Sequence, residues 1–161
     1  MSAHELAQLN IALMKEPLES PAMAGFVDNL ERINALADRT PGFVWRLQSD
    51  DGDATSVRPL GELTLVNLSV WRDLESLNQF VYQSGHVEIM RRRREWFERM
   101  GEAFVVLWWV PLGHRPTVEE AVARLELLRT AGASPEAFTF RKAFGPPGDK
   151  GRAPPPVRSD G

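Results

Sequence analysis

Two ionisable side chains, His86 and Arg93, stand out because they interrupt the apolar face of a predicted helix. When residues 86–100 are placed at the α-helical period, Arg93 falls near the centre of the apolar arc and His86 falls within it. A neutral imidazole can accept or donate a proton near neutral pH, and a guanidinium can bind an anionic or carbonyl oxygen. These two residues are therefore the candidate catalytic groups for a bound small molecule. The rest of the arc consists of Ile89, Met90, Trp96, Phe97 and Met100.

Both residues also have less specific interpretations. Arg93 could extend along the helix to water, pair with an internal carboxylate, or line a wet cavity. His86 could be a hydrogen-bonded core histidine, a pocket acid or base, or a metal ligand. Neither His4 nor His114 has a ligand spacing with His86, so no metal site is predicted. The neighbouring arginines at 91, 92 and 94 are expected on a solvated face.

Polar side chains inside predicted strands form a second candidate set. Gln8 and Asn10 share one face of the first strand, and Asn67 and Ser69 share one face of the third. Amide and hydroxyl groups in apolar strands need hydrogen-bond partners. They are either solvated or paired at a sheet edge, or they form a pocket floor that faces the helix of His86. The further candidate ligand contacts are Trp71, Met90, Trp96 and Trp109.

The elements that must position these groups can be predicted from hydrophobic periodicity and from turn signals. Alternation with period two is typical of strands, and apolar residues at helical spacing are typical of amphipathic helices. Ser20-Pro21, Asp73 and the capping box at Thr117 indicate helix starts. Strands are expected over residues 5–14, 43–49, 62–71 and 103–111, and helices over 21–39, 73–83, 86–100 and 117–129.

The order β-α-β-β-α-β, followed by one further helix, predicts a ferredoxin-like α+β fold. In that arrangement one antiparallel sheet carries its helices on one face. The other face also carries tryptophan and leucine side chains, which have to be covered. A second sheet in a homodimer would cover them without any extra sequence.

Composition limits the classes of protein and of partner. The 161 residues suit one domain, expected over residues 1–144, and the stretch 145–161 is rich in glycine and proline and is expected to be disordered. The formal net charge of −3 argues against nucleic acid as a partner. The longest apolar run, residues 103–111, is too short to span a bilayer, and the N-terminus has no signal-peptide pattern. We therefore expect a cytoplasmic protein without a membrane partner.

The common catalytic motifs are absent from the sequence. With no cysteine, the chain has no disulfide, thiolate metal site or cysteine nucleophile. There is no glycine-rich dinucleotide loop or P-loop, no H-E-x-x-H and no G-x-S-x-G. No pair of carboxylates lies in an apolar context. These absences exclude the most recognisable enzyme classes without excluding an enzyme.

Several longer strings carry a family resemblance. They are W-x-D-L-E-S-L-x-x-F-V-Y-x-S-x-H (71–86), R-R-R-E-W-F (92–97), V-L-W-W-V-P-x-G-x-x-P (106–116), E-A-x-x-R-L (120–125) and P-x-A-F-T-F (135–140). Over residues 4–144 the chain resembles a bacterial family known as domain of unknown function 3291. That family is similar to the dimeric α+β barrel superfamily, which includes antibiotic-biosynthesis-type and haem-degrading monooxygenases, aldoxime dehydratases and chlorite dismutases. The resemblance implies a homodimer with a cavity between each sheet and its helices.

The resemblance also implies roles for individual residues. In cofactor-free monooxygenases of the superfamily a histidine of this helix faces the cavity, and His86 matches that histidine. A polar residue on the first strand is also common there, and Asn10 matches it. In the haem-degrading members the iron-binding histidine falls about one helical turn later. This chain has Met90 near that position, so it departs from the haem-binding pattern. The leading hypothesis is therefore a small-molecule-binding, monooxygenase-like protein without a cofactor. The alternatives are haem binding with His86 as axial ligand, and a dimeric binding module without catalysis.

Overall fold

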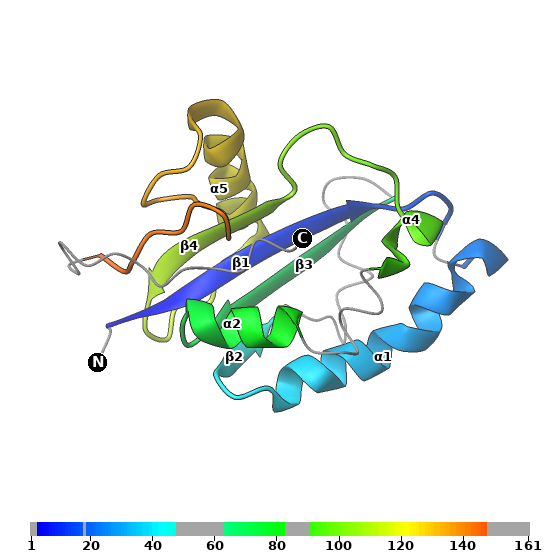
Figure 1. Cartoon of the computed structure of the whole chain (residues 1–161), viewed down its shortest axis with the longest axis horizontal. Helices are drawn as coiled ribbons and strands as arrows, with labels where there is room; N and C mark the ends of the chain where they lie inside the picture. Colours follow the sequence, from blue (N-terminus) through cyan, green and yellow to red (C-terminus); the bar gives the residue numbers. More distant parts are fainter. Residues whose placement is uncertain (1–2, 18, 48–62, 83–90, 148–161) are drawn as a thin grey trace.

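The fold is organised around one antiparallel sheet of four strands, in the order β2-β3-β1-β4 (Figure 1). The computed structural model describes residues 3–17, 19–47, 63–82 and 91–147. In the part of the chain so described, no helix is long and apolar enough to cross a membrane. The strands are β1 (His4–Leu13), β2 (Phe43–Arg46), β3 (Thr64–Trp71) and β4 (Val105–Pro111).

The strand order confirms the predicted ferredoxin-like α+β fold. Strands β1 and β3 occupy the middle of the sheet, β2 and β4 lie at its edges, and all neighbouring strands are antiparallel. In the register between β1 and β3, Gln8 lies opposite Ser69 and Asn10 lies opposite Asn67. Because side chains alternate between the two faces of a strand, this register places all four polar side chains on one face.

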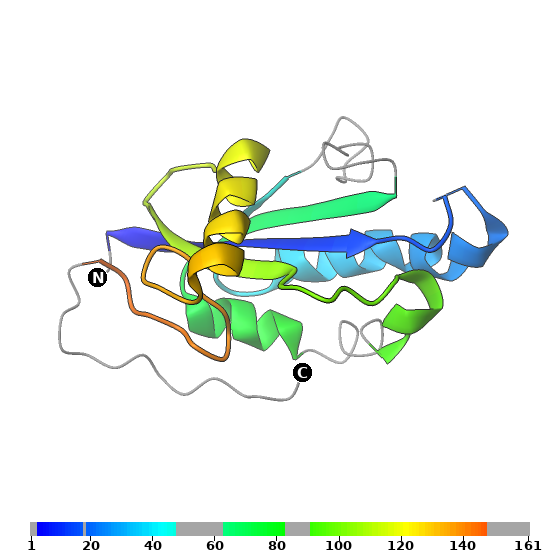
Figure 2. The same ribbon diagram turned by 90° about the horizontal axis from the view of Figure 1, so that it is seen from above.

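The helices begin at the side-chain caps that the sequence indicates. The Asp73 carboxylate accepts a hydrogen bond from Ser76 N at 2.8 Å, and the Thr117 hydroxyl accepts one from Glu120 N at 3.1 Å. Figure 2 shows that α1 and α2 cover one face of the sheet, while α5 covers the other. The helical segments are η1 (Pro21–Met23), α1 (Ala24–Arg39), α2 (Leu74–Val81), α4 (Arg93–Trp96) and α5 (Val118–Ala131).

The position of α5 differs from the predicted arrangement, in which all helices lie on one face. Ala121 and Leu125 of α5 pack with Leu9, Val106 and Trp108 on the second face of the sheet. Leu9, Val106 and Trp108 have no exposed surface. These apolar residues, for which the sequence predicted cover by a second sheet, are thus buried by α5 of the same chain. The homodimer stays a prediction.

The helix expected over residues 86–100 is the main error in the predicted elements. Helix α4 ends at Trp96, and the chain then pairs with the end of β1. Lys15 N donates to Trp96 O at 2.8 Å, and Glu98 N donates to Leu13 O at 2.8 Å. This extended pairing replaces the last helical turn that periodicity alone predicts. Residues 83–90, with His86 and Met90, lie outside the described residues, as does most of the predicted disordered tail.

A close contact fixes α2 against the turn between α1 and β2. Gly42 in this turn has a φ of 90°, a conformation that favours glycine. A Cβ atom placed on Gly42 would overlap the side-chain oxygen of Ser76. The Gly42 carbonyl also accepts a hydrogen bond from Arg72 N at 2.7 Å. Glycine at this position therefore allows the start of α2 to pack directly on the turn.

Candidate functional site

A cavity of about 720 Å³ lies between the sheet and helices α1 and α2. Its volume is within the usual range for small-molecule pockets. All four strands contribute to its lining, from Phe43 on β2 to Val105 on β4, and residues 139–141 after α5 complete it. The cavity therefore extends across the full width of the sheet.

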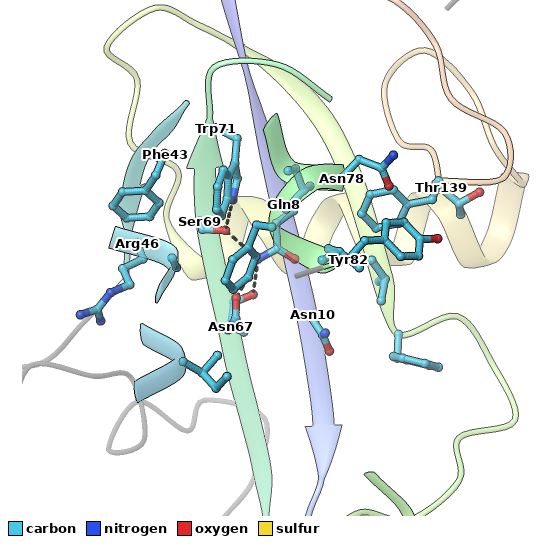
Figure 3. A pocket seen from close by; sticks show the side chains of 18 of the residues that line it. Gln8, Asn10, Phe43, Arg46, Asn67, Ser69, Trp71, Asn78, Tyr82 and Thr139 are labelled. Carbon is cyan, nitrogen blue, oxygen red and sulfur yellow. Dashed lines mark hydrogen bonds between the residues drawn. The ribbon is translucent and has the colours of Figure 1, made fainter. Parts of the chain in front are cut away.

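The floor of the cavity is a row of hydrogen-bonded polar side chains at the centre of the sheet (Figure 3). Gln8 Nε2 donates to Asn67 Oδ1 at 2.7 Å and to Ser69 Oγ at 2.8 Å. Trp71 Nε1 also donates to Ser69 Oγ, at 2.8 Å. Gln8, Ser69 and Trp71 are 8%, 6% and 1% exposed, so the two hydrogen bonds to Ser69 are shielded from bulk water, whereas Asn67 is an exposed residue. We call Gln8, Asn67, Ser69 and Trp71 the polar row.

The register of β1 and β3 explains how the polar row forms. Gln8 lies directly opposite Ser69, and Asn67 lies two residues further along the same face of β3. A long side chain can reach both the directly opposite residue and its diagonal neighbour on an antiparallel sheet. The amide of Gln8 does so and thereby links the two strands. Gln8 is not among the predicted ligand contacts, although it shares a face with Asn10.

The polar row leaves hydrogen-bonding capacity that no described residue uses. Ser69 Oγ accepts from two N–H groups, so both of its lone pairs are engaged and its own proton has no acceptor among the described residues. Gln8 Oε1 and the side-chain amide of Asn10 likewise have no partner within the described chain, and both residues line the cavity. The floor therefore offers one hydroxyl donor and both amide donors and acceptors to a ligand.

Aromatic side chains form much of the remaining wall. Trp71 stacks on Phe80 of α2, with ring centroids 5.2 Å apart and an interplanar angle of 26°. Phe43 of β2 meets the Trp71 ring edge-on at 5.3 Å. Together with the hydrogen bond to Ser69, these contacts fix the plane of the Trp71 indole. Tyr82, Phe104 and Phe140 also line the cavity.

The charged side chains of the described lining are both arginines, Arg46 and Arg141. Arg46 forms a two-point ion pair with Asp38 of α1, with Nε–Oδ1 at 2.9 Å and Nη2–Oδ2 at 3.3 Å. In Figure 3 its guanidinium points away from the polar row. None of the described lining residues is an aspartate or a glutamate.

Asn78 of α2 is an unusual member of the lining. Its Oδ1 atom is buried and has no hydrogen-bond partner among the described residues. Buried polar atoms are almost always paired, because an unpaired one costs about 1–3 kcal/mol. No sequence pattern marks this residue, since an asparagine on a short helix is ordinarily a surface residue.

The structure brings several of the predicted ligand contacts together. Asn10, Asn67, Ser69 and Trp71 all line the one cavity. Two other predicted contacts lie elsewhere. Trp96 is 1% exposed and packs in a separate cluster with Met14, Met23, Leu65 and Phe97. Trp109 is not in the described lining, and its Nε1 donates to Phe144 O at 2.8 Å.

Arg93 lies behind the cavity wall and is not part of the lining. Its guanidinium stacks over Phe104, 4.5 Å from the ring centroid, and lies 5.9 Å from that of Phe97. Burial lowers the pKa of the Arg93 guanidinium from its usual value. No carboxylate in the described chain pairs with it, so the internal ion pair considered from the sequence is not formed there. Arg93 thus supports Phe104, and Phe104 faces the cavity.

The fold and the cavity define a ferredoxin-like α+β protein with an aromatic pocket over a polar sheet centre. The chain belongs to the family described as domain of unknown function (DUF3291), whose model matches residues 5–153. The resemblance found in the sequence is thereby confirmed. A comparison with curated proteins gives no match.

Solved structures with a similar chain path share little sequence with this protein. SnoaB, a cofactor-independent oxygenase from Streptomyces nogalater, is 21% identical with a TM-score of 0.41, covering 73% of this chain and 100% of that chain. A protein from Shewanella oneidensis is 11% identical with a TM-score of 0.48, covering 68% and 93%. A conserved protein from Methanosarcina mazei Go1 is 13% identical with a TM-score of 0.47, covering 68% and 93%. The fold assignment rests on the strand order of the sheet.

Proposed function

We propose that this protein binds a planar aromatic molecule with oxygen substituents in the cavity over the polar row. The observation that carries this proposal is the polar row itself, in which three of the four side chains are buried and which has unused hydrogen-bonding capacity between aromatic walls. Apolar pockets with a few convergent polar groups are typical of small-molecule sites. Ser69 would donate to a ligand oxygen, and the amide of Asn10 would orient a second one.

The dimensions of the cavity support a ligand of two or three fused rings. Neighbouring strands lie about 4.8 Å apart, so three spacings across the four-stranded sheet give about 14 Å. The aromatic side chains of the lining near Trp71, which include Phe80, Tyr82 and Phe140, provide a wall against which a ring system can pack. An extended aliphatic ligand would gain less from such a wall.

The reaction we propose is a monooxygenation without a cofactor. The substrate would be a quinol or another polyphenol, because such a ring supplies its own electrons to dioxygen. One oxygen atom enters the ring, and the other leaves as water with two hydrogen atoms from the substrate. Removal of the first proton leaves an anionic ring oxygen, which hydrogen-bond donors such as Ser69 and Asn10 would stabilise.

In this proposal His86 is the acid or base, as the sequence suggests. Tyr82 lines the cavity and precedes His86 by four residues. This closeness in sequence to a lining residue supports the role proposed for His86. Arg93 would act through Phe104, by holding that ring against the bound substrate. A homodimer and a cytoplasmic location are further parts of the proposal, the first of which sedimentation equilibrium would test.

The binding part can be tested by isothermal titration calorimetry with 2-naphthol. We expect binding to the unaltered protein, weakened about threefold to tenfold by Ser69→Ala, because one hydrogen bond is lost. Ser134→Ala is the matched control, since Ser134 Oγ is also buried but is not in the described lining. If 2-naphthol does not bind, or if both variants weaken it equally, the assignment of the cavity is wrong.

The reaction can be tested separately with 1,4-dihydroxynaphthalene under labelled dioxygen. Monooxygenation gives 2-hydroxy-1,4-naphthoquinone and water, whereas spontaneous oxidation gives 1,4-naphthoquinone and hydrogen peroxide. The labelled hydroxyquinone should form with the unaltered protein and be absent with His86→Ala. Binding without turnover would leave a binding module. A Soret band after addition of haem, lost in His86→Ala, would assign the cavity to haem instead.

A further inference from the structure

The two arginines of the lining lie at opposite sides of the sheet and differ in their partners. Arg46 belongs to β2, the strand at one edge. Arg141 belongs to the segment after α5, which pairs with β4 at the other edge. The polar row lies between them on the two central strands. A ligand stacked over the row would therefore have one cation near each end.

Of Arg46 and Arg141, only Arg141 has a charge that is available to a ligand. Arg46 is compensated by the two contacts with Asp38. Arg141 is exposed and has no carboxylate partner in the described part of the chain. The described lining also has no acidic side chain. The electrostatic potential at this end of the cavity therefore favours an anion and disfavours a cation.

The backbone that carries Arg141 is anchored on both sides. Phe138, with no exposed surface, exchanges two hydrogen bonds with Leu107 of β4, at 2.8 and 2.9 Å. Further along, the Phe144 carbonyl accepts the indole N–H of Trp109 at 2.8 Å. Arg141 lies between these two anchors, so its Cα has a fixed position at the rim. Because the backbone is already anchored, only the side chain of Arg141 has to be ordered when it binds an anion.

We propose that Arg141 binds a carboxylate of the ligand, so that the substrate class is an aromatic hydroxy acid. This inference rests on the proposed pocket function. The ring would pack against the aromatic side chains of the lining, its hydroxyl or carbonyl oxygen would meet the polar row, and its carboxylate would reach the guanidinium of Arg141. The planar fork of an arginine matches the two oxygens of a carboxylate.

The test compares 3-hydroxy-2-naphthoate with 3-hydroxy-2-naphthamide, which has the same shape without the charge. The unaltered protein should bind the carboxylate about fivefold more tightly than the amide, an advantage typical of a partly exposed ion pair. Arg141→Gln should abolish that advantage and leave amide binding unchanged. Lys142→Gln removes the same charge one residue away, at an exposed position that is not in the lining, and should keep the advantage.

The outcomes separate the two proposals. If both compounds bind and the preference for the carboxylate is the same in Arg141→Gln as in the unaltered protein, the role of Arg141 is refuted while the pocket stands. The same holds if Lys142→Gln abolishes the preference equally, since the effect is then one of net charge. If neither compound binds to the unaltered protein, the proposed pocket function fails, and the Arg141 proposal fails with it.

Discussion

The side-chain amide of Gln8 on β1 donates to the hydroxyl of Ser69 on β3 at 2.8 Å, and that hydroxyl also accepts the indole N–H of Trp71. A single hydroxyl thus satisfies two buried donors from two different residues. Its removal leaves both donors short of a partner, because nothing else in the described lining replaces it for Trp71. This relationship makes Ser69 important for stability as well as for the proposed binding.

We predict that Ser69→Ala lowers the free energy of unfolding by about 2–4 kcal/mol, since unpaired buried donors cost about 1–3 kcal/mol each. Urea denaturation followed by circular dichroism measures this change. Ser134→Ala serves as the control, because the Ser134 hydroxyl has no described partner to lose. A loss in Ser69→Ala no larger than that in Ser134→Ala would contradict the described network.

We predict that Asn78→Leu raises the free energy of unfolding, in contrast to Ser69→Ala. Its buried Oδ1 has no described partner, so an apolar side chain of similar size removes a cost of about 1–3 kcal/mol. The free energy of unfolding should rise, while binding of 2-naphthol should weaken because the lining changes. Gln79→Leu is a suitable control, since Gln79 is exposed on the same helix. A less stable Asn78→Leu protein would show that the asparagine has a partner within the fold.

Gly42→Ala should be strongly destabilising, because the new Cβ overlaps the Ser76 side chain and the φ of 90° is unfavourable for alanine. Gly113→Ala separates the two effects. Gly113 has a φ of 85°, but nothing lies within 4 Å of its added Cβ. We expect about 1 kcal/mol for the conformational strain at Gly113 and at least twice that at Gly42 in thermal unfolding. Equal losses would mean that α2 moves away from the turn without cost.

The half-buried charge of Arg93 leads to a comparison of two substitutions. Arg93→Met removes a charge that burial disfavours and keeps an apolar stem over Phe104, so stability should be kept or raised. Arg93→Ala also loses that packing and should be less stable than Arg93→Met by about 1–2 kcal/mol. Chemical denaturation of the two variants measures the difference. If Arg93→Met is less stable than the unaltered protein, the cation–π contact outweighs the cost of burying the charge.

The sheet and most helices could be predicted because local signals and tertiary structure agree. The strand predicted over residues 62–71 is observed as β3 (Thr64–Trp71), and the caps at Asp73 and Thr117 are formed as expected. The helix predicted to end at residue 100 is too long, because the backbone of Trp96 and Glu98 hydrogen-bonds to the chain at the end of β1, a tertiary contact that helical periodicity does not report. The face covered by α5 could not be predicted, since a helical pattern does not specify which side of a sheet it packs on.

The candidate site could be predicted in part. Asn10, Asn67, Ser69 and Trp71 were identifiable because polar residues in apolar strands need partners, and the strand period puts them on one face. Asn78 and Arg141 have no such contrast with their neighbours in sequence. Their place in the cavity depends on how α2 and the segment after α5 pack, which is a property of the tertiary fold.

The lining of the cavity extends along the chain from Gln8 to Arg141, and every strand contributes to it. No fragment that lacks one of the strands therefore contains the whole lining, and we expect a ligand to bind only after the domain has folded. Occupancy would shift the folding equilibrium by mass action, so the melting temperature should rise with ligand concentration. Thermal shift measurements on the intact chain thus provide a search for the natural ligand in mixtures of aromatic acids, because a rise in melting temperature reports binding whether or not the ligand reacts.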